Sequence, residues 1–127
     1  MTLTTSHQGI ILFAHGSRDS LWRRPIEAVA ELIQQQSPDT VVACAYLELT
    51  TPDLPSTAAG MIAQGVRHIA ILPMFLGVGR HAREDLPELV KQLQTAHPHV
   101  AFDLRRAIGE EPQLTQVMAQ IALSSVQ

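Results

Sequence analysis

The chain has 127 residues, of which 46% are apolar and 4% aromatic, and its net charge at pH 7 is −3. This length predicts one compact domain over residues 1–127, and a chain of this size buries roughly two-thirds of its unfolded surface. The small net charge and the lack of a run of basic residues argue against a protein that binds nucleic acid or a membrane surface.

Cysteine usage and the amino-terminal residues predict a cytoplasmic protein. Cys44 is the only cysteine, so no intrachain disulfide can form and a reducing compartment is expected. No apolar run approaches the ~20 residues of a membrane span. Met1 to Gln8 lack the basic and apolar blocks of a signal peptide, and we expect a short flexible lead over residues 1–8.

Short apolar runs alternate with amphipathic segments along the chain. The expected strands are Ile10–Ala14, Thr40–Leu47, Arg67–Leu76 and His99–Leu104. The expected helices are Trp22–Gln36, a segment from Thr51-Pro52-Asp53 to Gly65, Asp85–Ala96, and a last helix after Gly109-Glu110-Glu111-Pro112.

Local features set the expected ends and faces of the helices. The hydroxyl of Thr51 is expected to cap the second helix, and Pro87 should fall in the first turn of the third. The last helix is expected to turn one apolar face toward the core, formed by Leu114, Val117, Met118 and Ile121.

A strand followed by a helix, four times over, predicts an α/β fold with a parallel sheet flanked by helices. Right-handed crossovers favour the strand order 2-1-3-4, as in flavodoxin-like folds. In such sheets a ligand binds at the carboxyl ends of the strands, where neighbouring connections leave in opposite directions. Here that point lies between the first and third strands.

Three side chains of chemical interest converge on this predicted crevice. His15 follows the first strand, Glu48 the second and His81 the third. Each histidine alone could simply cap a strand end through backbone hydrogen bonds, but two at one crevice favour a functional pair. The histidines that precede strands, His68 and His99, should lie at the opposite end of the sheet.

The chemistry of this trio favours a divalent metal. A neutral imidazole near pH 7 can bind such an ion or accept a proton. Two ring nitrogens suit iron, cobalt or nickel better than magnesium or calcium. Glu48 could supply an oxygen ligand, orient a histidine or accept a proton, and an ordinary solvated glutamate is the alternative.

Arginine dominates the basic residues, since eight of nine are arginine and Lys91 is the exception. Arginine can hold a carboxylate through two parallel hydrogen bonds, so arginines near a cleft indicate an anionic ligand. Those expected on the predicted rim are Arg18, Arg23, Arg24, Arg80 and Arg83. The glycines of Gly77-Val78-Gly79 do not have the spacing of a dinucleotide-binding fingerprint.

Three segments together resemble the small sirohydrochlorin chelatases of the class II metal chelatases, a family of cobalt, iron and nickel inserters. They are Ala14-His15-Gly16-Ser17-Arg18-Asp19, Tyr46-Leu47-Glu48-Leu49, and Leu72 to Leu76 running on to Gly79-Arg80-His81-Ala82-Arg83-Glu84-Asp85-Leu86-Pro87. The combination, in this order and at this spacing, is specific, and the likeness covers nearly the whole chain.

The resemblance implies a chelatase-like half-domain that inserts a divalent metal into sirohydrochlorin, a tetrapyrrole with many carboxylates, in cobalamin- or siroheme-type biosynthesis. It implies His15, His81 and Glu48 as catalytic residues, with His15 and His81 handling the metal. Arg18, Arg80 and Arg83 would hold carboxylates, and Met74, Phe75 and Leu76 would grip the macrocycle. The metal is a substrate, no organic cofactor is needed, and a homodimer is expected.

Two other functions compete with metal insertion. A protein that carries metal or tetrapyrrole without catalysis would need the same cleft. A phosphate-handling enzyme that uses His15 as nucleophile is suggested by the pair His15-Gly16.

Overall fold

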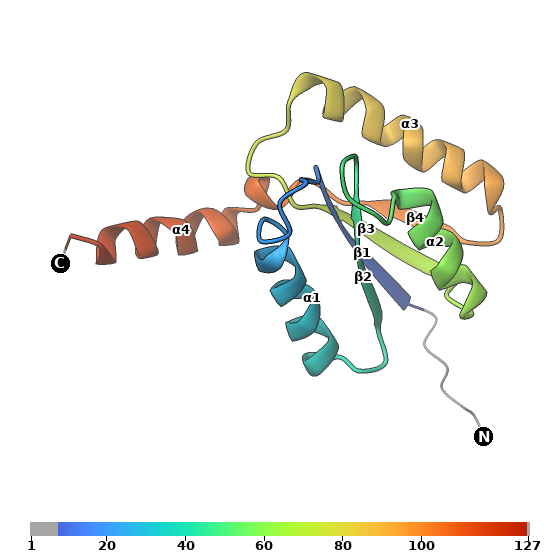
Figure 1. Cartoon of the computed structure of the whole chain (residues 1–127), viewed down its shortest axis with the longest axis horizontal. Coiled ribbons are helices and arrows are strands. Elements are labelled where there is room, and N and C mark those ends of the chain that lie inside the picture. Colours follow the sequence, from blue (N-terminus) through green and yellow to red (C-terminus); the bar gives the residue numbers. More distant parts are fainter. Residues whose placement is uncertain (1–7, 127) are drawn as a thin grey trace.

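The computed structural model describes residues 8–126 and contains a four-stranded parallel sheet with helices on both faces (Figure 1). In chain order the elements are β1 (Gln8–Ala14), α1 (Arg24–Gln36), β2 (Val41–Tyr46), α2 (Leu54–Ala63), β3 (His68–Pro73), α3 (Arg80–Ala96), β4 (Ala101–Leu104), the 3-10 helix η1 (Ile108–Glu110) and α4 (Pro112–Ser124). The sheet order is β2-β1-β3-β4, so the predicted fold class and strand order are confirmed.

The register of the sheet aligns the carboxyl ends of the three neighbouring strands β2, β1 and β3. Ala14 at the end of β1 pairs with Tyr46 at the end of β2, and Phe13 pairs with Pro73 at the end of β3. The chain therefore leaves these strands at one edge, and the connections that follow them start side by side.

The two faces of the sheet are covered unequally. One face carries Ile11, Phe13, Ile69 and Ile71, which form the buried core with apolar side chains of α2 and α3. Because side chains alternate along a strand, Ile10, Ala70 and Leu72 point to the other face. There α1 packs on β2, and no residue of α1 is buried. The core therefore lies mainly between the sheet and the pair α2 and α3.

Helix α3 begins at Arg80, five residues before the expected start at Asp85. Gly79 is the extended N-cap residue, and the residues after it are good helix formers that continue the helix without a break. Pro87 therefore lies inside the helix, and its expected place in the first turn is wrong. A proline there cannot donate to the carbonyl of Arg83, four residues earlier.

The cap of α2 also differs from the expectation. Asp53, rather than Thr51, is the N-cap residue, and its carboxylate accepts a hydrogen bond from the backbone N–H of Ser56 at 2.8 Å. Hydrogen bonding to Ser56 lowers the pKa of the Asp53 carboxyl. The helix ends as expected just before Gly65, which has a positive φ of 98°.

The expectation that α4 turns its apolar face toward the core is wrong. Val117 is 44% exposed, Met118 37% and Ile121 65%, and no residue of α4 is buried. The helix contacts the rest of the domain mainly through η1 and extends away from it (Figure 1). Periodicity identified which face of α4 is apolar, but this chain's own sheet does not cover it.

The expected lead over residues 1–8 falls largely outside the described residues, and Gln8 already belongs to β1. Between residues 8 and 126, the helices are all too short or too polar to cross a membrane.

The connections that follow β1 and β2 continue to pair after the strands end. The backbone N–H of Leu47 donates to the carbonyl of Ala14, and that of Glu48 donates to the carbonyl of His15, both at 2.9 Å. Farther along, the hydroxyl of Thr50 accepts from the N–H of Ser17 at 3.1 Å and donates to its carbonyl at 2.5 Å. We call residues 14–17 and 47–50 the paired exit loops.

Gly16 allows this close approach. It has φ of 103°, and a Cβ atom at this position would lie 1.7 Å from the carbonyl oxygen of Glu48. We therefore expect Gly16→Ala to separate the paired exit loops and to lower the free energy of unfolding by about 2 kcal/mol or more, measured by urea denaturation.

Gly77→Ala is the matched control, because a Cβ atom there meets nothing within 4 Å. Its unfolding free energy should stay within about 0.5 kcal/mol of the unchanged chain. Equal stability of the two variants would contradict the role given to Gly16.

Candidate active site

The structure brings His15, Glu48 and His81 to one pocket of about 220 Å³ at the carboxyl ends of β1 and β3. Its lining consists of Phe13, His15, Leu47, Glu48, Phe75, His81, Ala82, Asp85, Leu86 and Leu89. We call it the histidine pocket. Its polar side chains are exposed, whereas Phe13, Phe75 and Leu86 are buried, so polar groups surround an apolar floor.

An aromatic stack fixes the imidazole of His15. Its ring lies 4.5 Å from the ring of Phe75, centroid to centroid, at an interplanar angle of 32°. Phe75 in turn meets Phe13 edge-on at 6.3 Å. Because Phe75 is only 5% exposed, it supports His15 from the core side.

The paired exit loops place Glu48 beside His15. The backbone hydrogen bond from Glu48 to His15 joins these residues directly, so the carboxylate and the imidazole start from adjacent points of the main chain. Both side chains reach solvent. His15 and Glu48 are 33 positions apart in the sequence, and the parallel pairing of β1 with β2 brings them together.

His81 lies in the first turn of α3, one residue after the helix begins. Asp85 follows one turn later, at the spacing that puts two side chains on one helix face, and it lines the same pocket. Asp85 is absent from the set of site residues predicted from the sequence, because the expected helix started only at that residue. A predicted helix start at Gly79-Arg80 would place His81 and Asp85 one turn apart on the same helix face, and so would identify them as a pair.

These side chains can bind an ion and accept protons. Two imidazoles can coordinate a divalent transition metal, and two carboxylates can orient them or take up protons. Within residues 8–126, no cluster of three or more histidine, cysteine, aspartate or glutamate side chains is arranged as a complete metal site.

The predicted arginines do not line the histidine pocket. Arg80 is exposed and forms an ion pair with Glu84 at 3.3 Å. Arg83 lines a separate hollow of about 340 Å³ on the other side of the start of α3, together with Arg105 and Arg106. We call this the arginine hollow. Arg105 and Arg106 follow β4 at the same edge of the sheet, and they lie outside the residues predicted from the sequence.

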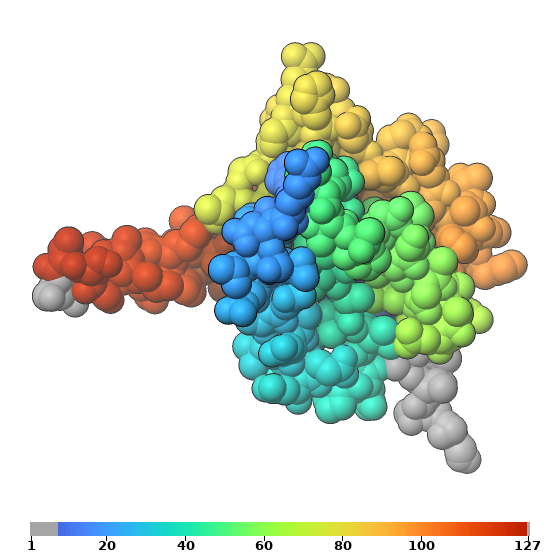
Figure 2. Space-filling view, viewed as in Figure 1, coloured from blue at the N-terminus to red at the C-terminus, as the bar shows by residue number. Residues whose placement is uncertain are grey.

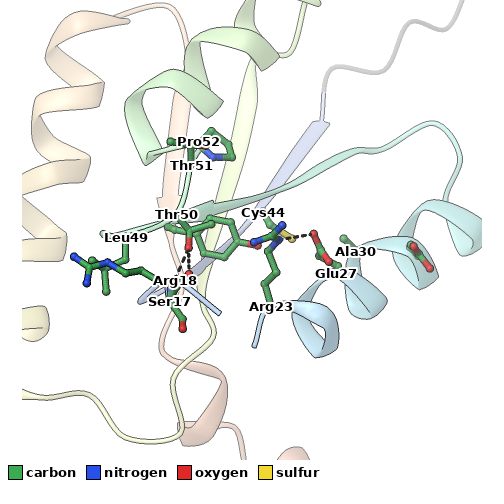
Figure 3. Close-up of a pocket in the computed structure, with 12 residues that line it drawn as sticks. Ser17, Arg18, Arg23, Glu27, Ala30, Cys44, Leu49, Thr50, Thr51 and Pro52 are labelled. Carbon is green, nitrogen blue, oxygen red and sulfur yellow. Dashed lines mark hydrogen bonds and ion pairs between the residues drawn. The ribbon is translucent and has the colours of Figure 1, made fainter. Parts of the chain in front are cut away.

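Arg18 and Arg23 line another pocket, of about 950 Å³, which lies between α1 and the end of β2 (Figure 3). Arg23 forms an ion pair with Glu27 at 3.3 Å, drawn as a dashed line in Figure 3. Burial raises the pKa of the Tyr46 hydroxyl to about 12 and also raises the pKa of the neighbouring Cys44 thiol. The paired exit loops separate this pocket from the histidine pocket.

Of the apolar trio expected to grip a ligand, Phe75 lines the histidine pocket and the other two do not. Met74 is half-buried, and its backbone N–H donates to the carbonyl of Phe13 at 2.7 Å, which extends the pairing of β1 with β3. Leu76 is 67% exposed and lies against η1, since the N–H of Gly109 donates to the carbonyl of Phe75.

Solved structures resemble this fold over most of its length. A CbiX protein from Marinobacter aquaeolei VT8 is 32% identical, with a TM-score of 0.81 over 94% of this chain and 97% of that one. The sirohydrochlorin chelatase SirB from Bacillus subtilis subspecies spizizenii, solved in complex with cobalt, is 25% identical, with a TM-score of 0.75. The similarity to SirB covers 89% of this chain and 48% of SirB.

Curated relatives include chelatases of two metals. The sirohydrochlorin cobaltochelatase of Methanococcus aeolicus is 31% identical over 83 residues, which are 65% of this chain and 58% of that protein. The sirohydrochlorin ferrochelatase of Bacillus subtilis is 26% identical over 111 residues, 87% of this chain and 42% of that protein. The matched parts thus span less than two-thirds of these relatives.

The model of the CbiX family matches residues 9–124, which is nearly the whole chain. The family match agrees with the sheet order and with the overall similarity to the Marinobacter CbiX protein. This chain belongs to the CbiX family.

Proposed function

We propose that this protein inserts a divalent metal ion, cobalt or iron, into sirohydrochlorin. The observation that carries the proposal is that His15 and His81 line one pocket in a chain of the CbiX family. The names of the relatives support the substrate, since they include both a sirohydrochlorin cobaltochelatase and a sirohydrochlorin ferrochelatase. Nickel remains a third candidate from the preference of imidazole nitrogens.

The size of the pocket determines how the substrates meet. Ligand pockets for drug-sized molecules have volumes of about 300–1,000 Å³, and a volume of 220 Å³ is below that range. A tetrapyrrole therefore lies across the mouth of the histidine pocket, and the metal lies between the imidazoles and the ring. The exposure of both histidines allows this approach.

Insertion exchanges two protons for one metal ion. The two pyrrole N–H groups of the macrocycle lose their protons as their nitrogens bind the metal, and the imidazoles release it. Glu48 and Asp85 lie at the mouth of the pocket and receive these protons, directly or through the histidines. The neutral imidazole is the form that binds the metal.

The arginine hollow is the proposed site for carboxylates of the macrocycle. Arg105 pairs with Asp103 at 3.2 Å, and Arg106 pairs with Glu111 at 3.0 Å. Among the described residues, Arg83 has no ion-pair partner, and its guanidinium is exposed. It can therefore hold a carboxylate without breaking an existing contact.

The direct test is the optical spectrum of sirohydrochlorin mixed anaerobically with cobalt, iron or nickel. Metallation should be faster with catalytic amounts of protein than without, and comparison of initial rates would identify the preferred metal. Stoichiometric binding without a rate gain would instead make the protein a carrier of metal or tetrapyrrole.

Removal of one metal-handling imidazole should abolish most of the activity without unfolding. We expect His81→Ala to lower the insertion rate about 100-fold or more, because positioned proton and metal carriers contribute that much. His81 is exposed, so the unfolding free energy should change by less than about 0.5 kcal/mol. His99→Ala, on an exposed histidine before β4, should leave the rate unchanged. Extensive unfolding of His81→Ala would indicate a structural histidine.

A role for Asp85 in proton uptake has its own test. Asp85→Asn removes the charge with little change of shape, and kcat should fall about tenfold or more, with the pH profile of kcat altered. Glu84→Gln is the matched control, since this neighbouring acid does not line the pocket and pairs with Arg80 instead. Equal kinetics for both variants would remove Asp85 from the mechanism.

A carboxylate clamp at Arg83 predicts a selective loss of affinity. We expect Arg83→Ala to raise KM for sirohydrochlorin about tenfold, as expected for one lost charge-assisted hydrogen bond, while KM for the metal stays the same. Lys91→Ala removes a charge farther along the exposed side of α3 and should change neither constant. An equal rise in both KM values would contradict the clamp.

A further inference from the structure

One residue beside the histidine pocket has a backbone conformation that does not suit its side chain. Leu49 has a φ of 65°, in the left-handed region, and between positions 8 and 126 it is the only residue other than glycine with a positive φ. Glycine, asparagine and aspartate adopt this conformation most readily, because the Cβ atom of a larger side chain comes too close to the backbone. Leu49 is also 54% exposed, so its side chain adds little to the core.

The fold accounts for the conformation of Leu49 but not for its side chain. Its neighbours in the sequence, Glu48 and Thr50, are both hydrogen-bonded to the opposite exit loop. The turn between these two anchors sets the positive φ at position 49. Glycine would adopt it without a steric cost, and strained residues of other types are typical of functional sites. The exposed leucine therefore indicates a contact with a molecule other than this chain.

Two exposed leucines lie on the two flanks of the paired exit loops. Leu47 is 43% exposed and lines the histidine pocket. Leu49 lines the pocket between α1 and the end of β2. In Figure 2 the chain after β1 (blue) and the chain after β2 (green) lie side by side at the surface, and the paired exit loops belong to these two segments. The loops therefore present an apolar side chain toward each pocket.

We propose that Leu49 is a binding contact for the macrocycle, which extends from the mouth of the histidine pocket across the paired exit loops. This inference rests on the proposed function. The Cα atoms of Leu47 and Leu49 are at most about 7 Å apart, because the two residues are separated by only one other. Four linked pyrrole rings are wider than this distance, so a macrocycle that covers the pocket mouth also reaches Leu49. Its apolar face then covers the exposed leucine and removes apolar surface from water.

The charges on the far side of the paired exit loops fit an anionic macrocycle. Arg18 lines the same pocket as Leu49 and is exposed, and among the described residues it has no ion-pair partner. Both residues lie at the end of this pocket that is away from α1 (Figure 3). The acidic side chains of the pocket, Glu27 and Glu31, belong to α1. A carboxylate that passes beyond Leu49 therefore meets a free cation first.

Four variants separate a contact with the macrocycle from a role in folding. Leu49→Gly and Leu49→Asn both suit the left-handed conformation and remove the apolar side chain. Leu49→Met keeps an apolar side chain of similar size. Leu32→Ala in α1 is the matched control, because Leu32 is 53% exposed and lines neither pocket.

The readouts are affinity, kinetics and stability. We expect Leu49→Gly and Leu49→Asn to raise the Kd of metal-free sirohydrochlorin about tenfold in a fluorescence titration, while Leu49→Met and Leu32→Ala stay within about twofold of the unchanged chain. In the insertion assay, KM for sirohydrochlorin should rise by the same factor, with kcat and KM for the metal unchanged. The urea midpoint of Leu49→Gly should equal or exceed that of the unchanged chain, since the strain is relieved.

The outcomes distinguish this inference from the proposed function. If the unchanged chain binds and metallates sirohydrochlorin but Leu49→Gly and Leu49→Asn bind it equally well, the contact at Leu49 is overturned and the proposed function stands. A lower urea midpoint for Leu49→Gly, with equal rises in both KM values, would assign the leucine to loop stability and would also overturn the contact. If the unchanged chain neither binds nor metallates sirohydrochlorin, the proposed function fails, and this inference fails with it.

Discussion

The pairing of the connections after β1 and β2 is the constraint on which the candidate site depends. Parallel strands bring their carboxyl ends to one edge, but this does not by itself fix the side chains that follow. Here the hydrogen bonds continue beyond the strands, since the N–H groups of Leu47 and Glu48 donate to the carbonyls of Ala14 and His15. His15 and Glu48 are thereby held as neighbours along the main chain beyond the ends of the strands. Gly16 permits this because a side chain would occupy the space of the Glu48 carbonyl.

A second set of contacts ties the site to the core and to the end of the chain. Phe75 packs under His15 and against Phe13, so a buried aromatic pair sets the position of an exposed imidazole. The carbonyl of the same Phe75 accepts a hydrogen bond from Gly109 of η1. One residue after β3 thus supports the histidine pocket on one side and the base of α4 on the other.

Much of this arrangement could be predicted from the sequence, and the exceptions have physical reasons. Short apolar runs predict the strands, and the handedness of the crossovers predicts their order. This order is enough to predict that His15, Glu48 and His81 lie at one edge of the sheet, where the structure places them. The sequence predicts that α3 starts at Asp85, with Pro87 in its first turn, whereas the helix begins at Arg80, and Asp85 is therefore absent from the predicted pocket residues. The apolar face of α4 was identified from periodicity, but periodicity does not say what covers a face. The arginine hollow combines α3 with residues after β4, and no local pattern links these segments.

The proline inside α3 has a mechanical consequence for the pocket. Without the hydrogen bond that an N–H at position 87 would give to Arg83, the first turns of the helix are joined to the remainder less stiffly than in an unbroken helix. Those turns carry His81, while His15 is anchored to the sheet. A small bend at this point changes the separation of the two rings and leaves the strands in place. Proline thus leaves the span between the two imidazoles adjustable at one point of α3, without repacking of the core.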